Sequence, residues 1–248
     1  MSNNLKIIAP VIQVVTPAYL EKEETIRRAI DSIRRQSSFE LLAKQVVVFD
    51  GVTNLSQQIV STPGLEVKVA QSRYNHSDYG DYIRRLGTRI AFMNNAFAVT
   101  FLDADNYWEK RHLEVVWNTH IRTRKNIVIS GRKVLWDDGS VTKNLRGRGF
   151  FDTNTITLFG VYKRIGLKWG RWPKEMSLYG DRIFSAYLQK NFSKEIAFTD
   201  EPTVNYEAAP IQSGKLEEFK KFIKDNQSSV DEILMKNLGM KLRFGTNF

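Results

Sequence analysis

The sequence contains no cysteine, and this absence removes several kinds of chemistry. Without thiols the chain has no disulfides, no thiolate zinc site and no cysteine nucleophile. Histidine is scarce too, because His76, His112 and His120 are the only three, so a histidine metal cluster is not expected. No apolar run approaches the roughly 20 residues that span a bilayer, and residues 1–5 lack the features of a signal peptide. We therefore expect a cytoplasmic protein.

What is present describes an ordinary globular chain with an excess of positive charge. The 248 residues are 42% hydrophobic and 26% charged, which fits one domain with a substantial core. The formal net charge is +10. Such a charge attracts partners that carry phosphate, namely nucleic acid, sugar nucleotides or an anionic membrane, and it does not choose among them.

The pattern of apolar residues predicts an α/β fold. Strands expected at 11–15, 45–49 and 97–102 alternate with helices expected at 21–35 and 84–95, which favours a mostly parallel sheet. A more exposed strand is expected at 65–70. The second half shifts toward antiparallel pairing, because Asp138-Gly139 between apolar segments indicates a hairpin. Further elements are expected as a helix at 108–122, strands at 126–130 and 155–162, and a helix that begins near residue 180.

The most informative segment is the buried strand that stops at Asp103-Ala104-Asp105. The carboxyl end of a buried strand delivers its side chains to the edge of the sheet where ligands of α/β proteins bind. Two carboxylates there suit a hard cation such as Mg²⁺ or Mn²⁺ that keeps positions open for phosphate. The alternative is that Asp103 begins a turn and Asp105 caps a helix.

Two earlier strand ends lead to the same edge, and the chain ends in a basic amphipathic tail. Thr16-Pro17 follows the first strand, and Asp50-Gly51 follows the second. From about Lys215, apolar residues recur at helical spacing among lysines. Such a tail packs on its own domain or lies on a membrane or a partner.

Five segments in this order resemble the inverting glycosyltransferases of family 2: residues 14–19, 47–51, 84–87, 101–106 and 180–182. The resemblance implies a glycosyltransferase-A (Rossmann-like) fold, with a central mostly parallel sheet flanked by helices, a smaller antiparallel acceptor-side sheet and a helical C-terminal tail. It also implies a single catalytic domain over 1–248. Its nucleotide-sugar-binding half ends at about 106, its acceptor-binding half covers about 107–210, and its tail covers about 211–248.

The resemblance also assigns roles by position. Asp105 binds the metal, Mn²⁺ or Mg²⁺, and Asp103 binds ribose and is a second candidate ligand, with Ala104 between them. Asp181 is the catalytic base, and its alternative is a helix cap. Arg84 is a candidate to contact the nucleotide base or the phosphate, and its alternative is a basic residue on an exposed helix face. The residues that bind the nucleotide base are Thr16, Pro17, Tyr19 and Asp50.

This sequence departs from the family pattern at several positions. Phe49 precedes Asp50 where the family often has a second acid, and Gly180 stands where an acid often precedes the base. No histidine follows His120 to complete a metal shell. The Gln-x-x-Arg-Trp motif of processive synthases is absent, so we expect transfer of one sugar per encounter.

The chemistry of sugar transfer explains why these residue types are needed. Negative charge grows on the leaving diphosphate, and a divalent cation stabilises it. The acceptor hydroxyl must lose its proton to a carboxylate, for which Asp181 is the candidate. Other residues are candidates for the acceptor side or for a mobile lid, against the alternatives of core packing or a solvated loop: Trp136, Arg146, Arg148, Asp152 and Asn154.

The sequence leaves partner and class alternatives open. A nucleotide-sugar donor is expected, with uridine favoured, and the acceptor is a glycan, a lipid-linked molecule or a protein. The tail offers peripheral membrane contact. A nucleotidyltransferase is the alternative enzyme, although it normally has a glycine-rich loop after the first strand, where this chain has Thr16-Pro17-Ala18-Tyr19. A basic nucleic-acid-binding module is less favoured, and no nucleic acid is expected, because the basic residues are scattered.

Overall fold

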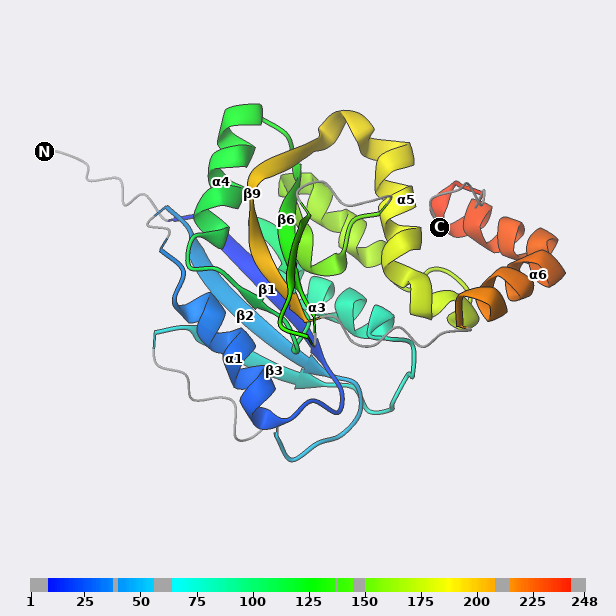
Figure 1. The fold of residues 1–248 in the computed structure, drawn as a ribbon, viewed down its shortest axis with the longest axis horizontal. Helices are drawn as coiled ribbons and strands as arrows, with labels where there is room; N and C mark the ends of the chain where they lie inside the picture. The colour runs from blue at the N-terminus through cyan, green and yellow to red at the C-terminus, as the bar shows by residue number, and fades with distance from the viewer. Residues whose placement is uncertain are drawn as a thin grey trace, which may run out of the picture.

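The computed structural model describes residues 9–37, 40–55, 64–136, 138–144, 150–207 and 215–241. Figure 1 shows an open sheet with helices on both faces. Its first half is parallel: β1 (Val11–Ala18) pairs with β2 (Leu42–Phe49) and β4 (Ala98–Phe101), and β2 pairs with β3 (Glu66–Gln71). Because these strands are parallel, their carboxyl ends meet at one edge, as the sequence predicted.

The strands of the second half extend this sheet instead of forming a smaller sheet of their own. β8 (Ile156–Phe159) pairs antiparallel with β4, and β6 (Ile127–Leu135) pairs antiparallel with β8. Within the described residues, the order along the sheet is β3-β2-β1-β4-β8-β6-β9-β5. The second half joins the same sheet because the backbone N–H and C=O groups of β4 on the side away from β1 need hydrogen-bond partners, and β8 supplies them.

The remaining strands complete the second half of the sheet. β9 (Ile196–Glu207) runs parallel to β6, and β5 (Tyr107–Trp108) pairs with β9. β7 (Val141–Asn144) pairs antiparallel with β6 across Asp138-Gly139, so the predicted hairpin is confirmed. The short strand β5 corrects the predicted helix at 108–122, because Tyr107 and Trp108 pair with Asn205 and Val204 before the helix begins.

Helices cover both faces of the sheet because the strand side chains alternate. Val15, Val46 and Val48 point into one cluster with Ile83 of α3 (Asp81–Met93) and Ile183 of α5 (Gly180–Phe192). Ile12 and Val14 point into a second cluster on the opposite face, under α1 (Glu23–Arg34) and α4 (His112–Thr123). Short 3-10 segments link the second half: Thr153–Thr155, Gly160–Lys168, Lys174–Tyr179 and Ser193–Glu195.

β1 continues past the point where the sequence predicted a break. Pro17 pairs with Val48 inside the strand, although proline has no N–H to donate. The proline is tolerated because β4 pairs with β1 only as far as Val15, and beyond that residue no other strand of the described part of the chain pairs with β1 on its β4 side.

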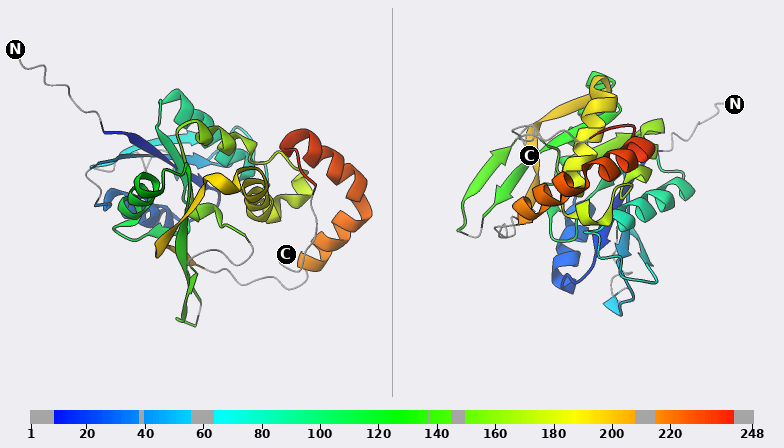
Figure 2. Two further views of the ribbon diagram at one scale, coloured as in Figure 1. Left: turned by 90° about the horizontal axis from the view of Figure 1, so that it is seen from above. Right: turned by 90° about the vertical axis from the view of Figure 1, so that its right-hand side faces the viewer.

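The C-terminal tail forms the helix α6 (Lys215–Leu238), which packs on its own domain. Ile223, Val230 and Leu234 are buried in the cluster that contains Leu188 of α5. Figures 1 and 2 show α6 beside α5, at the end of the molecule away from α1. Among the described helices, none is long and apolar enough to cross a bilayer.

Candidate active site

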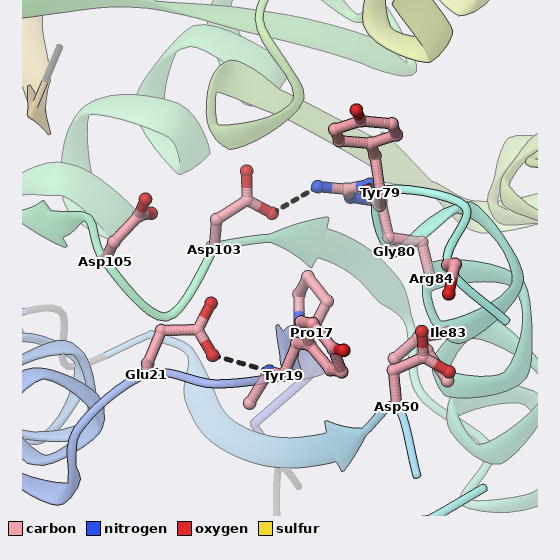
Figure 3. A pocket seen from close by; sticks show the side chains of 12 residues that line it. Pro17, Tyr19, Glu21, Asp50, Tyr79, Gly80, Ile83, Arg84, Asp103 and Asp105 are labelled. Atoms are coloured by element: carbon pink, nitrogen blue, oxygen red, sulfur yellow. Dashed lines mark hydrogen bonds and ion pairs between the residues drawn. The ribbon is translucent and has the colours of Figure 1, made fainter. Parts of the chain in front are cut away.

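A pocket of about 470 Å³ opens at the carboxyl ends of the parallel strands, between the loop after β1 and the first turn of α3. Figure 3 shows three acids, Glu21, Asp103 and Asp105, on one side of this pocket and Asp50 on the other. The wall is therefore built from segments that lie far apart in the sequence, as the strand-end argument predicted. Its lining residues are Pro17, Ala18, Tyr19, Glu21, Asp50, Ser77, Tyr79, Gly80, Ile83, Arg84, Asp103 and Asp105.

Asp103 is fixed from two sides. Arg84 Nη2 donates to its Oδ1 at 2.6 Å, and Asn154 Nδ2 donates to its Oδ2 at 3.1 Å. Arg84 is itself held, because Nη1 donates to the carbonyl oxygen of Tyr79 at 2.7 Å and its guanidinium lies 5.3 Å from the ring centre of Trp169. Arg84 is thus buried rather than on an exposed helix face, and it forms part of the pocket wall.

Asp105 lies beside the acids Asp103 and Glu21, and within the described residues its own carboxylate forms no ion pair. Burial, the charge of Asp103 and the charge of Glu21, in that order, raise the pKa of Asp105 to about 7. Its Oδ1 accepts a hydrogen bond from Asn106 Nδ2 at 2.9 Å. The guanidinium of Arg28 donates to the backbone oxygen of Asp105 at 2.7 Å and not to the carboxylate. An oxygen donor set with this excess of negative charge fits a hard divalent cation.

The described residues hold no ready-made cluster of three histidine, cysteine or acidic ligands. A cation at Asp105 would therefore take further oxygens from a bound phosphate or from water, which is the common arrangement for Mg²⁺. Asp103 is less available for this purpose, because both of its carboxylate oxygens already accept hydrogen bonds from the protein.

Asp50 is held by a residue that sequence reasoning missed. Its Oδ1 accepts hydrogen bonds from the backbone N–H of His76 at 2.9 Å and from His76 Nδ1 at 2.8 Å. The imidazole ring stacks on Tyr82 of α3 with 3.8 Å between ring centres. This contact fixes the carboxylate of Asp50 in the pocket wall. No local pattern around His76 announces the contact, because it depends on the approach of the loop before α3 to the end of β2.

Asp181 lies in the first turn of α5, on the second half of the chain. Its Oδ1 accepts a hydrogen bond from the backbone N–H of Arg182 at 2.7 Å. Burial and then the charge of Asp152 raise the pKa of Asp181 to about 7. A carboxylate with such a pKa is suited to take a proton near neutral pH.

Asp152 and Asn154 connect the two sides of the site. Asp152 forms an ion pair with Arg132 of β6, and its Oδ1 accepts from Asn154 Nδ2 at 2.9 Å. Asn154 in turn bonds to Asp103. The guanidinium of Arg132 also lies 5.0 Å from the ring centre of Tyr206. Both polar atoms of the Asn154 side chain form hydrogen bonds within the protein. Asn154 therefore orients the neighbouring carboxylates instead of offering its amide to a sugar.

Other predicted residues lie away from the pocket wall. Thr16 is fully buried, and its hydroxyl accepts a hydrogen bond from Gln45 Nε2 at 2.9 Å. Ala104 is buried in a small cluster with Phe49. Trp136 is exposed on the β6–β7 hairpin, where Nε1 donates to Thr142 Oγ1 at 3.0 Å. Arg146 and Arg148, the predicted lid, lie outside the described residues.

Two further acids belong to the site that the sequence did not single out. Glu21 lines the pocket beside Asp105. Asp81, the first residue of α3, is buried, and Trp172 Nε1 donates to its Oδ2 at 2.8 Å. Burial is the main cause that raises the pKa of Asp81 to about 8. Acids at helix starts are common, so Glu21 did not stand out, and Asp81 lies before the segment that the sequence predicted as helical.

Among solved structures, the fold matches the protein TarS of S. aureus. The 1–349 fragment in complex with UDP shares 19% identity with a TM-score of 0.61, over 92% of this chain and 70% of that one. The complex with UDP-GlcNAc shares 18% identity with a TM-score of 0.61, over 92% and 71%. A longer TarS chain is matched at 21% identity with a TM-score of 0.60, over 92% of this chain and 42% of that one.

Comparison of the sequence with known proteins identifies the family as well as the fold. No curated protein matches the chain. The sequence model described as "Glycosyl transferase family 2", however, matches residues 13–165, which is more than half of the chain and includes the pocket strands. This match favours sugar transfer over both the nucleotidyltransferase and the nucleic-acid-binding alternatives. The chain therefore belongs to glycosyl transferase family 2, and the protein is a glycosyltransferase with a glycosyltransferase-A fold.

Proposed function

We propose that the protein is a metal-dependent, inverting glycosyltransferase that moves one sugar at a time from a UDP-sugar to an acceptor hydroxyl. One observation carries the proposal: a single pocket at the strand ends holds the Arg84–Asp103 pair, Asp105 and Asp50. A guanidinium beside carboxylates suits a ligand that combines phosphate with hydroxyl and amide donors. The UDP and UDP-GlcNAc complexes of TarS support a uridine nucleotide as the donor.

Each pocket residue has a distinct part in holding the donor. Asp105 would hold Mn²⁺ or Mg²⁺, which when bound supplies positive charge that stabilises the leaving diphosphate. Asp103 keeps lone pairs for a ribose hydroxyl, since an ionised carboxylate has about four acceptor sites. Asp50, already fixed by His76, accepts the N–H of a uracil ring. Pro17 and Tyr19 line the base side of the same pocket.

Asp181 is the proposed general base on the acceptor side. It removes the proton of the acceptor hydroxyl as the oxygen attacks the anomeric carbon, and the bond to the diphosphate breaks on the opposite face. A single in-line displacement inverts the configuration at that carbon. The acceptor is a glycan, a lipid-linked molecule or a protein. Because the apolar face of α6 is buried, any peripheral membrane contact would use its lysines.

The test compares two carboxylate variants with a panel of sugar nucleotides and Mn²⁺. Asp105→Asn keeps the shape of the residue and removes its charge. We expect this variant to lose both sugar transfer and the slow hydrolysis of the donor. Asp200→Asn is the matched control, because Asp200 is exposed and pairs only with Arg122 among the interactions described. Equal activity in both variants would contradict the proposal. Proton NMR of the product reports whether the anomeric centre has inverted.

A further inference from the structure

The carboxylate of Asp81 lies between the donor pocket and the helix that carries Asp181. On one side, Arg84 Nη1 approaches Asp81 Oδ1 at 3.9 Å, while the other arm of the same guanidinium holds Asp103. Trp172 Nε1 fixes the second carboxylate oxygen. Asp81 is buried, and its carboxylate is oriented by the hydrogen bond from Trp172 and by the more distant charge of Arg84.

On its other side, Asp81 occupies the space that a side chain at position 180 would need. A Cβ atom added to Gly180 would lie 2.6 Å from Asp81 Oδ1, closer than real Cβ contacts, and 3.0 Å from Oδ2. Gly180 has ordinary helical backbone angles, with φ −56° and ψ −40°, so its glycine is needed for space and not for conformation. Gly180 is also the first residue of α5, directly before Asp181.

We propose that Asp81 is a positioning residue, whose carboxylate sets how closely the first turn of α5 approaches the donor pocket. The contacts run from Asp103 through Arg84 and Asp81 to Gly180, and so connect a donor-binding carboxylate to the helix of the base. This inference rests on the proposed role of Asp181.

The test is a double-mutant cycle of Gly180→Ala and Asp81→Ala, followed by transfer kinetics. Gly180→Ala pushes the first turn of α5 away, and we expect kcat to fall about 10- to 100-fold while the donor KM stays within about twofold. Asp81→Ala removes the contact without a clash and lowers kcat in the same direction. Arg84 keeps Asp103 and the Tyr79 carbonyl, so donor binding is retained. In the double variant the alanine methyl group occupies the vacated space, and part of kcat returns.

Gly166→Ala is the matched control. A Cβ atom there would lie 2.7 Å from Thr88 Oγ1, a similar overlap with the same helix α3, but away from α5. We expect its Tm to fall as much as that of Gly180→Ala, with kcat per folded molecule retained. Equal losses of kcat in both glycine variants, or additive effects in the double variant, would overturn the proposal.

Asp181→Asn separates the two proposals. If Asp181→Asn keeps full transfer while Gly180→Ala loses it, the assignment of Asp181 as the base fails. The positioning role of Asp81 is then retained, but the group that it positions is another residue of α5. If Asp181→Asn loses transfer while Gly180→Ala and Asp81→Ala keep it, the positioning role fails and the base assignment stands.

Discussion

Asn154 binds the backbone and the carboxylate of Asp103 at the same time. Its Oδ1 accepts from the Asp103 N–H at 2.5 Å, and its Nδ2 donates to Asp103 Oδ2 at 3.1 Å. The same Nδ2 donates to Asp152 Oδ1 at 2.9 Å. One buried amide thereby holds two carboxylates in a fixed relationship, one just after β4 and the other at the N-cap of the 3-10 turn Thr153–Thr155.

Replacing this amide should weaken both folding and donor binding. Asn154→Ala leaves buried donors and acceptors without partners, and we expect the free energy of unfolding to fall by about 1–3 kcal/mol. The affinity for UDP should fall as well, because Asp103 loses its orientation. Urea denaturation and isothermal titration with UDP and Mn²⁺ measure the two effects. Unchanged UDP affinity in the folded variant would show that Asp103 is oriented without Asn154.

Activity should depend on pH through Asp181. Its pKa is raised to about 7, and the active base is the ionised form, so kcat should fall as pH drops below about 7. The rate of Asp181→Asn should be lower by about 10²- to 10⁴-fold and should lack this limb. A pH profile of kcat at saturating donor tests this, and an unchanged profile in Asp181→Asn would assign the limb to another group.

The position of that limb should respond to Asp152. The charge of Asp152 is one cause that raises the pKa of Asp181, after burial. In Asp152→Asn the limb should therefore move to lower pH, because the ionised form of Asp181 loses a repulsive neighbour. A shift to higher pH would contradict the assignment.

His76 should contribute to donor binding through Asp50. His76→Phe keeps an aromatic ring against Tyr82 but removes the Nδ1 hydrogen bond to Asp50. We expect a rise in the Kd for UDP, with a smaller effect on the Kd for pyrophosphate, because Asp50 faces the base and not the phosphates in the proposed complex. Equal effects on both ligands would indicate a general disturbance of the pocket.

The tail should behave as part of the core. Leu234 of α6 is fully buried, so Leu234→Ala should lower the free energy of unfolding by about 2–5 kcal/mol. Met235, the next residue, is 47% exposed, and Met235→Ala serves as the control with a change of about 0.5 kcal/mol or less. Denaturant unfolding of both variants decides the matter. Equal small effects would mean that α6 is detached in solution.

The sequence predicted the parallel half of the fold because its signals are local. Buried strands that end next to Asp50 and Asp103 alternate with amphipathic helices. This spacing predicts both the parallel order of the strands and the edge of the sheet at which the two acids lie. The contacts of Asp81 with Gly180 and of Asn154 with Asp103 could not be predicted in this way. They join residues about 100 and 50 positions apart, and their geometry depends on how whole elements pack rather than on any local pattern.

The pairing of β4 with β8 has a mechanical consequence. The parallel strands of the first half and the strands of the second half share one continuous ladder of hydrogen bonds at this seam, where Ala98, Val99 and Thr100 face Phe159, Leu158 and Thr157. Two rigid bodies that bend about a hinge are incompatible with such a seam, because bending would break buried backbone bonds. Backbone amides at the seam should thus exchange with solvent only through global unfolding, and the two halves of the sheet should move as one body.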